Sequence, residues 1–316
     1  MAAPEIIDVH VHLSRDTAQE KLVWPRPGFP DEWYWANPEK VVPFMDREGI
    51  SHICTLTFID THSMLEQRLA RLTPATEKAK RETRRRFEDE MIERIKRFNT
   101  WGCELGAREK RIIPFSAIEI GLFFGREREM MEDLEEKIKL GARGVKMVPA
   151  VMGYFPGDRR MFPLYDRLQE VGLPILADSG TGTDIGIYKG ETYGEPVHFA
   201  EVFRSFPRLK FIMAHLPSAF WDERIDIARE FPQVYFDTAC GFNSEERRGR
   251  DGCRACSVDD AARLLRKVGV HRVLFGSDAP SVDFRPQVYQ ILGLPLSDEE
   301  KRRILRENAK EFLGLE

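Results

Sequence analysis

The sequence has few cysteines, no long uncharged apolar run and no strong excess of charge of either sign. Five cysteines in 316 residues cannot all pair within the chain, and their spacing is not that of a small disulfide-rich domain. No run of about 18 uncharged apolar residues occurs, which argues against a membrane-spanning helix. A net charge of −4 argues against a general nucleic-acid-binding protein. Because no signal-peptide hydrophobic region precedes the first apolar run either, we expect a soluble cytoplasmic protein with reduced thiols.

Short apolar runs alternate with helical segments along the whole chain. The apolar runs, which we interpret as strands, are 5–13, 52–59, 111–118, 144–148, 173–178, 209–215, 233–238 and 272–278. Amphipathic helices are expected at 38–48, 127–140, 161–171, 196–205, 218–230, 257–268 and 298–312. Strict alternation of strands and helices predicts a parallel sheet, and eight repeats predict a closed (β/α)8 TIM barrel. An open doubly wound sheet is the alternative architecture.

Two regions are longer than this repeat requires. Residues 14–37 form a loop rich in Trp and Pro, and residues 60–110 contain a long helix. Neither region has the composition of a flexible linker, and no internal repeat is visible. We therefore expect one α/β domain over residues 1–316, with insertions at about 14–37 and 60–110.

The first strand carries two histidines with one residue between them. Alternate residues of a strand point to the same face, so His10 and His12 should project side by side, with Cα atoms roughly 6.6 Å apart. Imidazole is a ligand for zinc, iron, nickel and similar metals. The pair alone is equally compatible with two histidines that alternate by coincidence on a partly exposed strand.

Later strands end in further side chains that can bind metals. Asp178 ends the fifth strand, His215 the sixth and Asp278 the eighth. The active site of a (β/α)8 barrel is built at the carboxyl ends of its strands, so the barrel would bring these residues to the histidine pair. Taken singly, Asp278 could instead cap a helix, and His215 could be a third ligand, a free acid or base, or a buried structural histidine.

Four segments of the chain together resemble a known group of enzymes. They are Asp8-Val9-His10-Val11-His12, Gly144-Val145-Lys146, Ala214-His215-Leu216 and Phe275-Gly276-Ser277-Asp278. This ordered set resembles the amidohydrolase superfamily, and more closely its amidohydrolase-2 branch of TIM-barrel metal-dependent hydrolases and decarboxylases, such as aminocarboxymuconate semialdehyde decarboxylase. The resemblance extends from residue 6 to residue 315.

The resemblance implies one divalent metal ion, with Zn²⁺ expected and Mn²⁺ or Fe²⁺ as alternatives. His10, His12 and Asp278 match the ligands of the family, and His215 matches a histidine that in the decarboxylases acts on the substrate or on metal-bound water. The sequence departs from the family at the fifth strand, where Asp178 stands in place of a histidine. We expect Asp178 to serve as the fourth ligand; a weakened metal site is the competing interpretation.

The resulting functional hypothesis is a metal-dependent hydrolase that acts on a small carboxylated lactone, amide or ester. Asp278 would take the proton of the attacking water and return it to the leaving group, and His215 would stabilise the developing oxyanion or shuttle a proton. Lys146 is a candidate for the substrate carboxylate or for a structural salt bridge, and Arg15 is a second candidate for binding an anionic group of the substrate.

Two alternatives remain open. The same residues would serve a non-oxidative decarboxylase of an unsaturated or aromatic acid, and a barrel without metal would be a non-catalytic binding protein. We expect a small-molecule substrate and neither nucleic acid nor membrane as a partner. Because dimers are frequent among similar proteins, a homodimer is one expected arrangement.

Overall fold

The computed structural model describes residues 5–73, 76–180, 192–217, 220–242 and 256–316. Eight strands form a single sheet in which each strand pairs in parallel with the next along the chain. The strands are β1 (Ile6–Val11), β2 (Ile50–Leu56), β3 (Ile112–Ala117), β4 (Gly144–Met147), β5 (Ile175–Asp178), β6 (Phe211–Ala214), β7 (Val234–Asp237) and β8 (Val273–Leu274). Seven of these strands lie within a predicted apolar run, and β2 begins two residues before the run at 52–59.

Backbone hydrogen bonds join β1 and His12 to residues 275–279, which follow β8. The N–H of Val9 donates to the carbonyl of Phe275 (2.9 Å), the N–H of Asp278 to that of His10 (2.9 Å), and the N–H of His12 to that of Ala279 (2.8 Å). We call this contact between β1 and residues 275–279 the seam. The seam closes the ring, so the predicted (β/α)8 barrel is confirmed and the open-sheet alternative is wrong.

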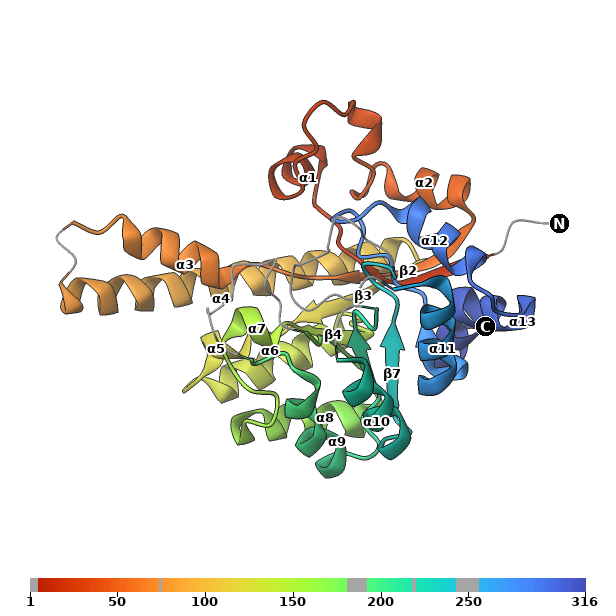
Figure 1. Cartoon of the computed structure of the whole chain (residues 1–316). Helices are drawn as coiled ribbons and strands as arrows, with labels where there is room; N and C mark the ends of the chain where they lie inside the picture. Colours follow the sequence, from red (N-terminus) through yellow and green to blue (C-terminus); the bar gives the residue numbers. More distant parts are fainter. Residues whose placement is uncertain (1–4, 74–75, 181–191, 218–219, 243–255) are drawn as a thin grey trace.

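Helices surround the strands on the outside of the barrel (Figure 1). They include α2 (Val41–Glu48), α6 (Glu127–Lys139), α8 (Phe162–Val171), α9 (Ala200–Ser205), α10 (Trp221–Glu230), α11 (Val258–Val268), α12 (Phe284–Gly293) and α13 (Asp298–Arg302), with α5 (Ile120–Phe123) and α7 (Pro149–Met152) as short turns. Side-chain caps fix several of these starts: Ser257 accepts from the N–H of Asp260 before α11, and Ser297 forms a capping box before α13. Among the described helices, none combines the length and apolarity needed to cross a membrane.

Both insertions contain helices, including the long helix predicted within residues 60–110. The loop expected at 14–37 contains α1 (Thr17–Val23), which begins where the Asp16 side chain accepts from the N–H of Gln19. The second insertion forms α3 (Thr61–Ala70) and the long helix α4 (Glu77–Arg108), a pair that extends well beyond the barrel in Figure 1. The prediction of an irregular loop at 14–37 is therefore wrong in part, because an N-cap starts a helix there.

The interior of the barrel is an apolar core, and a C-terminal helix covers the end of this core where the strands begin. Side chains of six strands meet in one cluster with Ala309, Phe312 and Leu313 of α14 (Asn308–Leu313). Arg143 and Lys210, which precede β4 and β6, donate to the backbone carbonyls of Leu313 and Phe312. Helix α14 thus covers the end of the barrel where the strands begin, and the opposite end remains for polar side chains.

Candidate functional site

Each histidine of the β1 pair is fixed through one ring nitrogen and presents the other to the same carboxylate. His10 Nδ1 lies 2.8 Å from Asp237 Oδ2, and His12 Nδ1 lies 3.1 Å from the carbonyl of Leu56. The two Nε2 atoms lie 3.5 Å and 3.2 Å from Asp278 Oδ1. Partners on Nδ1 set the orientation and tautomer that metal-binding histidines need, with Nε2 available for an ion.

The histidine at the centre of the group is uncharged. His10 is fully buried, and its pKa is lowered to about 4, chiefly by burial and then by the Lys146 ammonium, whose Nζ lies 3.5 Å from Nε2. Only neutral imidazole can bind a metal ion, so the electrostatics of His10 suit a ligand.

Asp278 reaches the group because the chain turns sharply after β8. Its backbone adopts a left-handed conformation (φ 63°), and its N–H is held by the carbonyl of His10 across the seam. Burial alone would raise the pKa of this carboxyl, but the hydrogen bond with His12 and the neighbouring histidines hold the pKa well below its usual range. Asp278 is therefore an ionised acceptor between both imidazoles.

Asp178, Lys146 and His215 form a second group beside the first. The Lys146 ammonium is ion-paired with Asp178 Oδ1, and His215 Nε2 lies 3.3 Å from the same oxygen. Burial, the largest single effect, opposes the ionisation of Asp178, but Lys146, His215 and His10 together keep the pKa of the carboxyl below its usual range. Of the two roles predicted for Lys146, the salt bridge is present in the structure, since its side chain is buried inside the barrel.

Two overlapping trios of these residues have donor atoms close enough to hold an ion. One nitrogen or oxygen each from His10, His12 and Asp278 lie within 4.8 Å of one another, and the same holds for His10, Asp178 and His215. The hydrogen bonds recorded for Asp178 among the described residues all use Oδ1, which leaves Oδ2 for a further contact. Two imidazoles and a carboxylate around one point are a donor set that zinc, manganese and iron accept.

Two residues of the site were not predicted. Asp237 ends β7 and holds three groups at once: Oδ2 faces His10, while Oδ1 accepts from the N–H groups of His215 (2.8 Å) and Ala239 (3.1 Å). Cys240 follows three residues later, and its Sγ lies 3.1 Å from Asp278 Oδ2. The rule that singled out Asp178 and Asp278 at strand ends applies equally to Asp237 and could have found it.

A cavity of about 810 Å³ opens beside His12 and is built mainly by the two insertions. Its wall includes Trp24, Phe58, Phe98 and Trp101, and the ring centroids of Trp24 and Phe58 lie 5.8 Å and 6.1 Å from that of His12. Three arginines also line it: Arg15, Arg94 and Arg97. Arg15 is thus placed in the cavity, whereas Lys146 lies beneath the histidines and does not line it.

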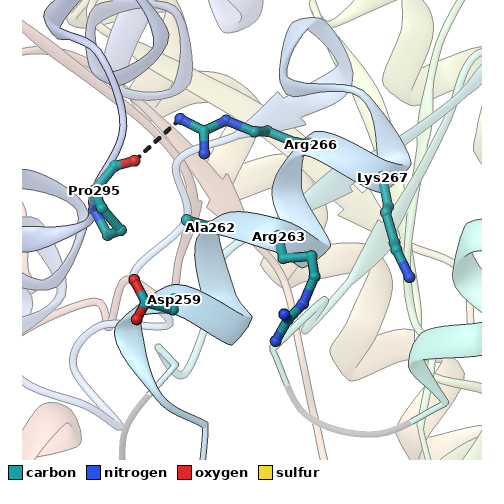
Figure 2. Close-up of a pocket in the computed structure, with 6 residues that line it drawn as sticks. All are labelled: Asp259, Ala262, Arg263, Arg266, Lys267 and Pro295. Carbon is teal, nitrogen blue, oxygen red and sulfur yellow. Dashed lines mark hydrogen bonds between the residues drawn. The ribbon is translucent and has the colours of Figure 1, made fainter.

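A smaller hollow of about 380 Å³ lies on the outer side of α11 and is not a comparable site (Figure 2). Arg266 donates to the carbonyl of Pro295 (3.0 Å) and to the carboxylate of Glu300, so its charge is already paired. The residues that line this hollow include no histidine and no cysteine. The candidate site is therefore the barrel mouth and the cavity beside His12.

Comparisons with known proteins agree with this geometry. Similar solved structures include an uncharacterized TIM-barrel protein from Bordetella bronchiseptica (19% identity, TM-score 0.68, 98% of this chain and 99% of that chain). A 2,6-dihydroxybenzoate decarboxylase from Rhizobium is similar over 100% of this chain and 99% of that chain (15% identity, TM-score 0.67). A dihydroxybenzoic acid decarboxylase from Polaromonas, solved with manganese and the inhibitor 2-nitroresorcinol, is similar over 99% and 97% (16% identity, TM-score 0.64).

At these identities the structural likeness establishes the fold, and the family follows from a separate comparison. No curated protein sequence matched the chain. A family model described as Amidohydrolase matches residues 7–315. The chain therefore belongs to the amidohydrolase family, in its amidohydrolase-2 branch.

Proposed function

We propose that the protein is a metal-dependent hydrolase that acts on a small carboxylated lactone, amide or ester. The observation that carries the proposal is the convergence of His10 Nε2 and His12 Nε2 on the Asp278 carboxylate at the mouth of the barrel. We propose zinc as the ion, with Mn²⁺ and Fe²⁺ as alternatives, held by His10, His12, Asp278 and Asp178. When bound there, the ion supplies Lewis acidity toward an oxygen of the substrate.

The protein side chains would transfer protons and stabilise the charge that develops at the scissile bond. Asp278 takes a proton from the attacking water and returns it to the leaving group. His215 faces Asp178 from across the mouth and donates a hydrogen bond to the oxyanion that develops on the carbonyl. Asp237 holds His10 and the backbone of His215, so it positions both sides of this arrangement.

The cavity indicates the chemistry of the substrate. Arg15, Arg94 and Arg97 place guanidinium groups around a space walled by aromatic rings. Guanidinium pairs with a carboxylate through two parallel hydrogen bonds, and an aromatic wall favours a planar or apolar body. We therefore expect a carboxylate at the arginine-lined side of the cavity and the reacting group near His12.

A specific observation also favours a second candidate, the non-oxidative decarboxylation of an aromatic acid. The aromatic wall of the cavity suits a benzoate-like ring, and two of the structurally similar proteins are decarboxylases of dihydroxylated benzoic acids. In this reaction His215 or Asp278 would deliver a proton to the ring carbon that loses CO₂. The two candidates share all of the site residues described above.

One substrate panel separates the two reactions. The zinc-loaded protein is given carboxylated lactones, amides, esters and hydroxylated benzoic acids, and release of titratable acid and of CO₂ are measured in parallel. Acid release without CO₂ supports the hydrolase, and CO₂ release supports the decarboxylase. Arg15→Gln should raise KM for the active compound about tenfold or more with a smaller change in kcat, because the arginine binds the substrate outside the reacting centre.

The metal-free binding barrel is tested by metal analysis. Protein purified without chelator should contain about one equivalent of transition metal at the His10–His12–Asp278 position, and His10→Ala should lose it. Asp178→Ala tests the fourth ligand: a metal content and affinity equal to those of the wild type would remove Asp178 from the ligand set. Wild-type protein that binds no transition metal would contradict the hydrolase and the decarboxylase together.

A further inference from the structure

Cys240 lies in the mouth of the barrel, between two side chains that can bind metals. Its backbone is left-handed (φ 71°), as are those of His215 (φ 62°) and Asp278 (φ 63°), at the ends of three successive strands. Left-handed backbone is uncommon outside glycine and is retained where the surrounding structure requires it. These turns direct three different donor types, an imidazole, a thiol and a carboxylate, toward one another.

The donor atoms of this trio lie within the same distance limit as those of the histidine pair and Asp278. One donor atom each from His215, Cys240 and Asp278 lie within 4.8 Å of one another. Cys240 Sγ is 3.1 Å from Asp278 Oδ2, whereas Oδ1 of the same carboxylate faces His10 and His12. The two oxygens of Asp278 therefore point to two different donor groups, as a carboxylate that bridges two ions would require.

Cys240 also differs from the other cysteines that the structure describes. Cys54 and Cys103 are buried, and the Sγ of Cys103 faces the carbonyl of Lys137 at 3.9 Å. Cys256 lies against the carbonyl of Ser257. Cys240 is half-buried and has an imidazole and a carboxylate beside its sulfur, which is the environment in which a thiol becomes a metal ligand.

We propose that Cys240 is a thiolate ligand of a second divalent transition-metal ion, held by His215, Cys240 and Asp278, with Asp278 bridging to the ion at the histidine pair. The inference rests on the metal centre of the proposed function. Binding replaces the thiol proton, which leaves to solvent. In this two-ion state His215 is a ligand instead of the oxyanion contact. A soft thiolate selects zinc, cobalt or iron over manganese and magnesium.

Cobalt provides a test that does not depend on activity. Metal-free full-length protein is titrated with Co²⁺ without oxygen, while bound cobalt and the sulfur-to-cobalt charge-transfer absorption in the near ultraviolet are recorded. Wild-type protein should bind two equivalents, one of which carries the charge-transfer band. Cys240→Ser and Cys240→Ala should lose the band and one equivalent, and the matched control Cys103→Ser should keep both.

The outcomes separate this inference from the metal centre on which it rests. His10→Ala should lose the other equivalent and keep the band. Wild-type protein that binds cobalt at the histidine pair without the band would overturn the role of Cys240 and leave the proposed function standing. A charge-transfer band that persists in Cys240→Ser would show that Cys240 is not the thiolate ligand. If the wild type binds a single equivalent of cobalt that carries the band, and His10→Ala loses that equivalent, there is no second metal site apart from the histidine pair. Either result would overturn the proposal.

A second measurement needs no variant. Zinc should slow alkylation of Cys240 by iodoacetamide at least tenfold in the wild-type protein, as followed by mass spectrometry of the peptide that contains it. An unchanged rate with zinc bound would also overturn the proposal.

Discussion

Asp237 links parts of the site that lie far apart in the sequence. One of its oxygens faces His10 Nδ1, and the other accepts from the backbone of His215 and Ala239. It is fully buried, so its contacts are not weakened by water. This carboxylate fixes the ring of His10 and the turn that carries His215.

We expect Asp237→Asn to weaken zinc binding by about 10- to 100-fold, because the amide no longer holds the His10 ring in the orientation and tautomer that expose Nε2. Competition with a chromophoric chelator measures the affinity. Asp226→Asn, an exposed change on α10, is the control and should leave the affinity unchanged. Wild-type affinity in Asp237→Asn would contradict the positioning role.

A second buried carboxyl predicts how stability depends on pH. Glu119 is 1% exposed, and burial raises its pKa to about 8, although Thr61 Oγ1 donates to Oε2 at 2.5 Å. The folded state therefore keeps a proton that the unfolded state loses near its ordinary pKa of 4.5. Stability from this group is complete below the unfolded pKa and is lost as the pH rises through the folded pKa.

We expect Glu119→Gln to remove this pH dependence. The free energy of unfolding of the variant, relative to wild type, should rise by a few kcal/mol, roughly 1.4 kcal/mol for each unit of pKa shift, between about pH 5 and about pH 8. Urea unfolding across that range measures it. Parallel curves for the two proteins would show that Glu119 titrates normally in the folded state.

The sequence predicted most of the site residues that lie within or end the apolar runs; Asp237, which ends β7, is the exception. His10, His12, Asp178 and Asp278 follow from alternation on a strand and from the rule that barrel sites lie at strand ends. Cys240 was not predicted because it lies beyond the apolar run at 233–238, and only the left-handed turn after β7 returns it to the mouth. The pairing of Lys146 with Asp178 likewise depends on the rotamers of two buried side chains.

At the scale of elements, the insertions determine the cavity. Helix α4 contributes Phe98, Trp101, Arg94 and Arg97 to its wall, and the segment after β1 contributes Arg15 and Trp24. Phe98 recurs with Phe87, Met91 and Ile95 at helical spacing, which is the pattern of an ordinary packing stripe. The other three are buried, but Phe98 is only partly buried and faces the cavity, because the helix passes from packing on α3 to lining the site.

The outer half of the α3–α4 pair has a small core of its own, so we expect it to open independently of the barrel. Phe87 packs with Leu65 and Met91, and it is 1% exposed. Phe87→Ala should cost about 3 kcal/mol of local stability. Hydrogen exchange should then accelerate in residues 61–95 and remain unchanged in β5 to β7. Leu140→Ala, at an exposed position that follows α6, is the control; uniform acceleration would show one cooperative unit.

At the scale of the molecule, the two ends of the barrel differ in composition: one end is polar and the other is apolar. Polar side chains gather where the strands end, while α14 joins the inner apolar core where they begin. Leu176 and Asp178 lie on the same face of β5, so the core lies directly beneath the site. Stability and chemistry can therefore be changed at opposite ends of one barrel.

Phe312→Ala tests this separation. Phe312 is 4% exposed and lies against Tyr235, with ring centroids 4.6 Å apart. We expect the variant to lose about 3–5 kcal/mol of global stability, because the substitution leaves a cavity in the inner core, while metal content stays at the wild-type level. Urea unfolding and metal analysis measure the two effects, and Tyr289→Ala at an exposed position is the control. Loss of metal from folded Phe312→Ala would show that the two ends are coupled.

The seam also affects how the chain folds while it is being synthesised. β1 is synthesised first, yet the outward-facing backbone groups of Val9, His10 and His12 find their partners only in residues 275–279, almost a full chain length later. An unpaired strand edge is a template for pairing with other chains. Until residues 275–279 are synthesised, this edge of β1 has no partner in the barrel, so we expect the nascent chain to be more prone to aggregation than the closed ring.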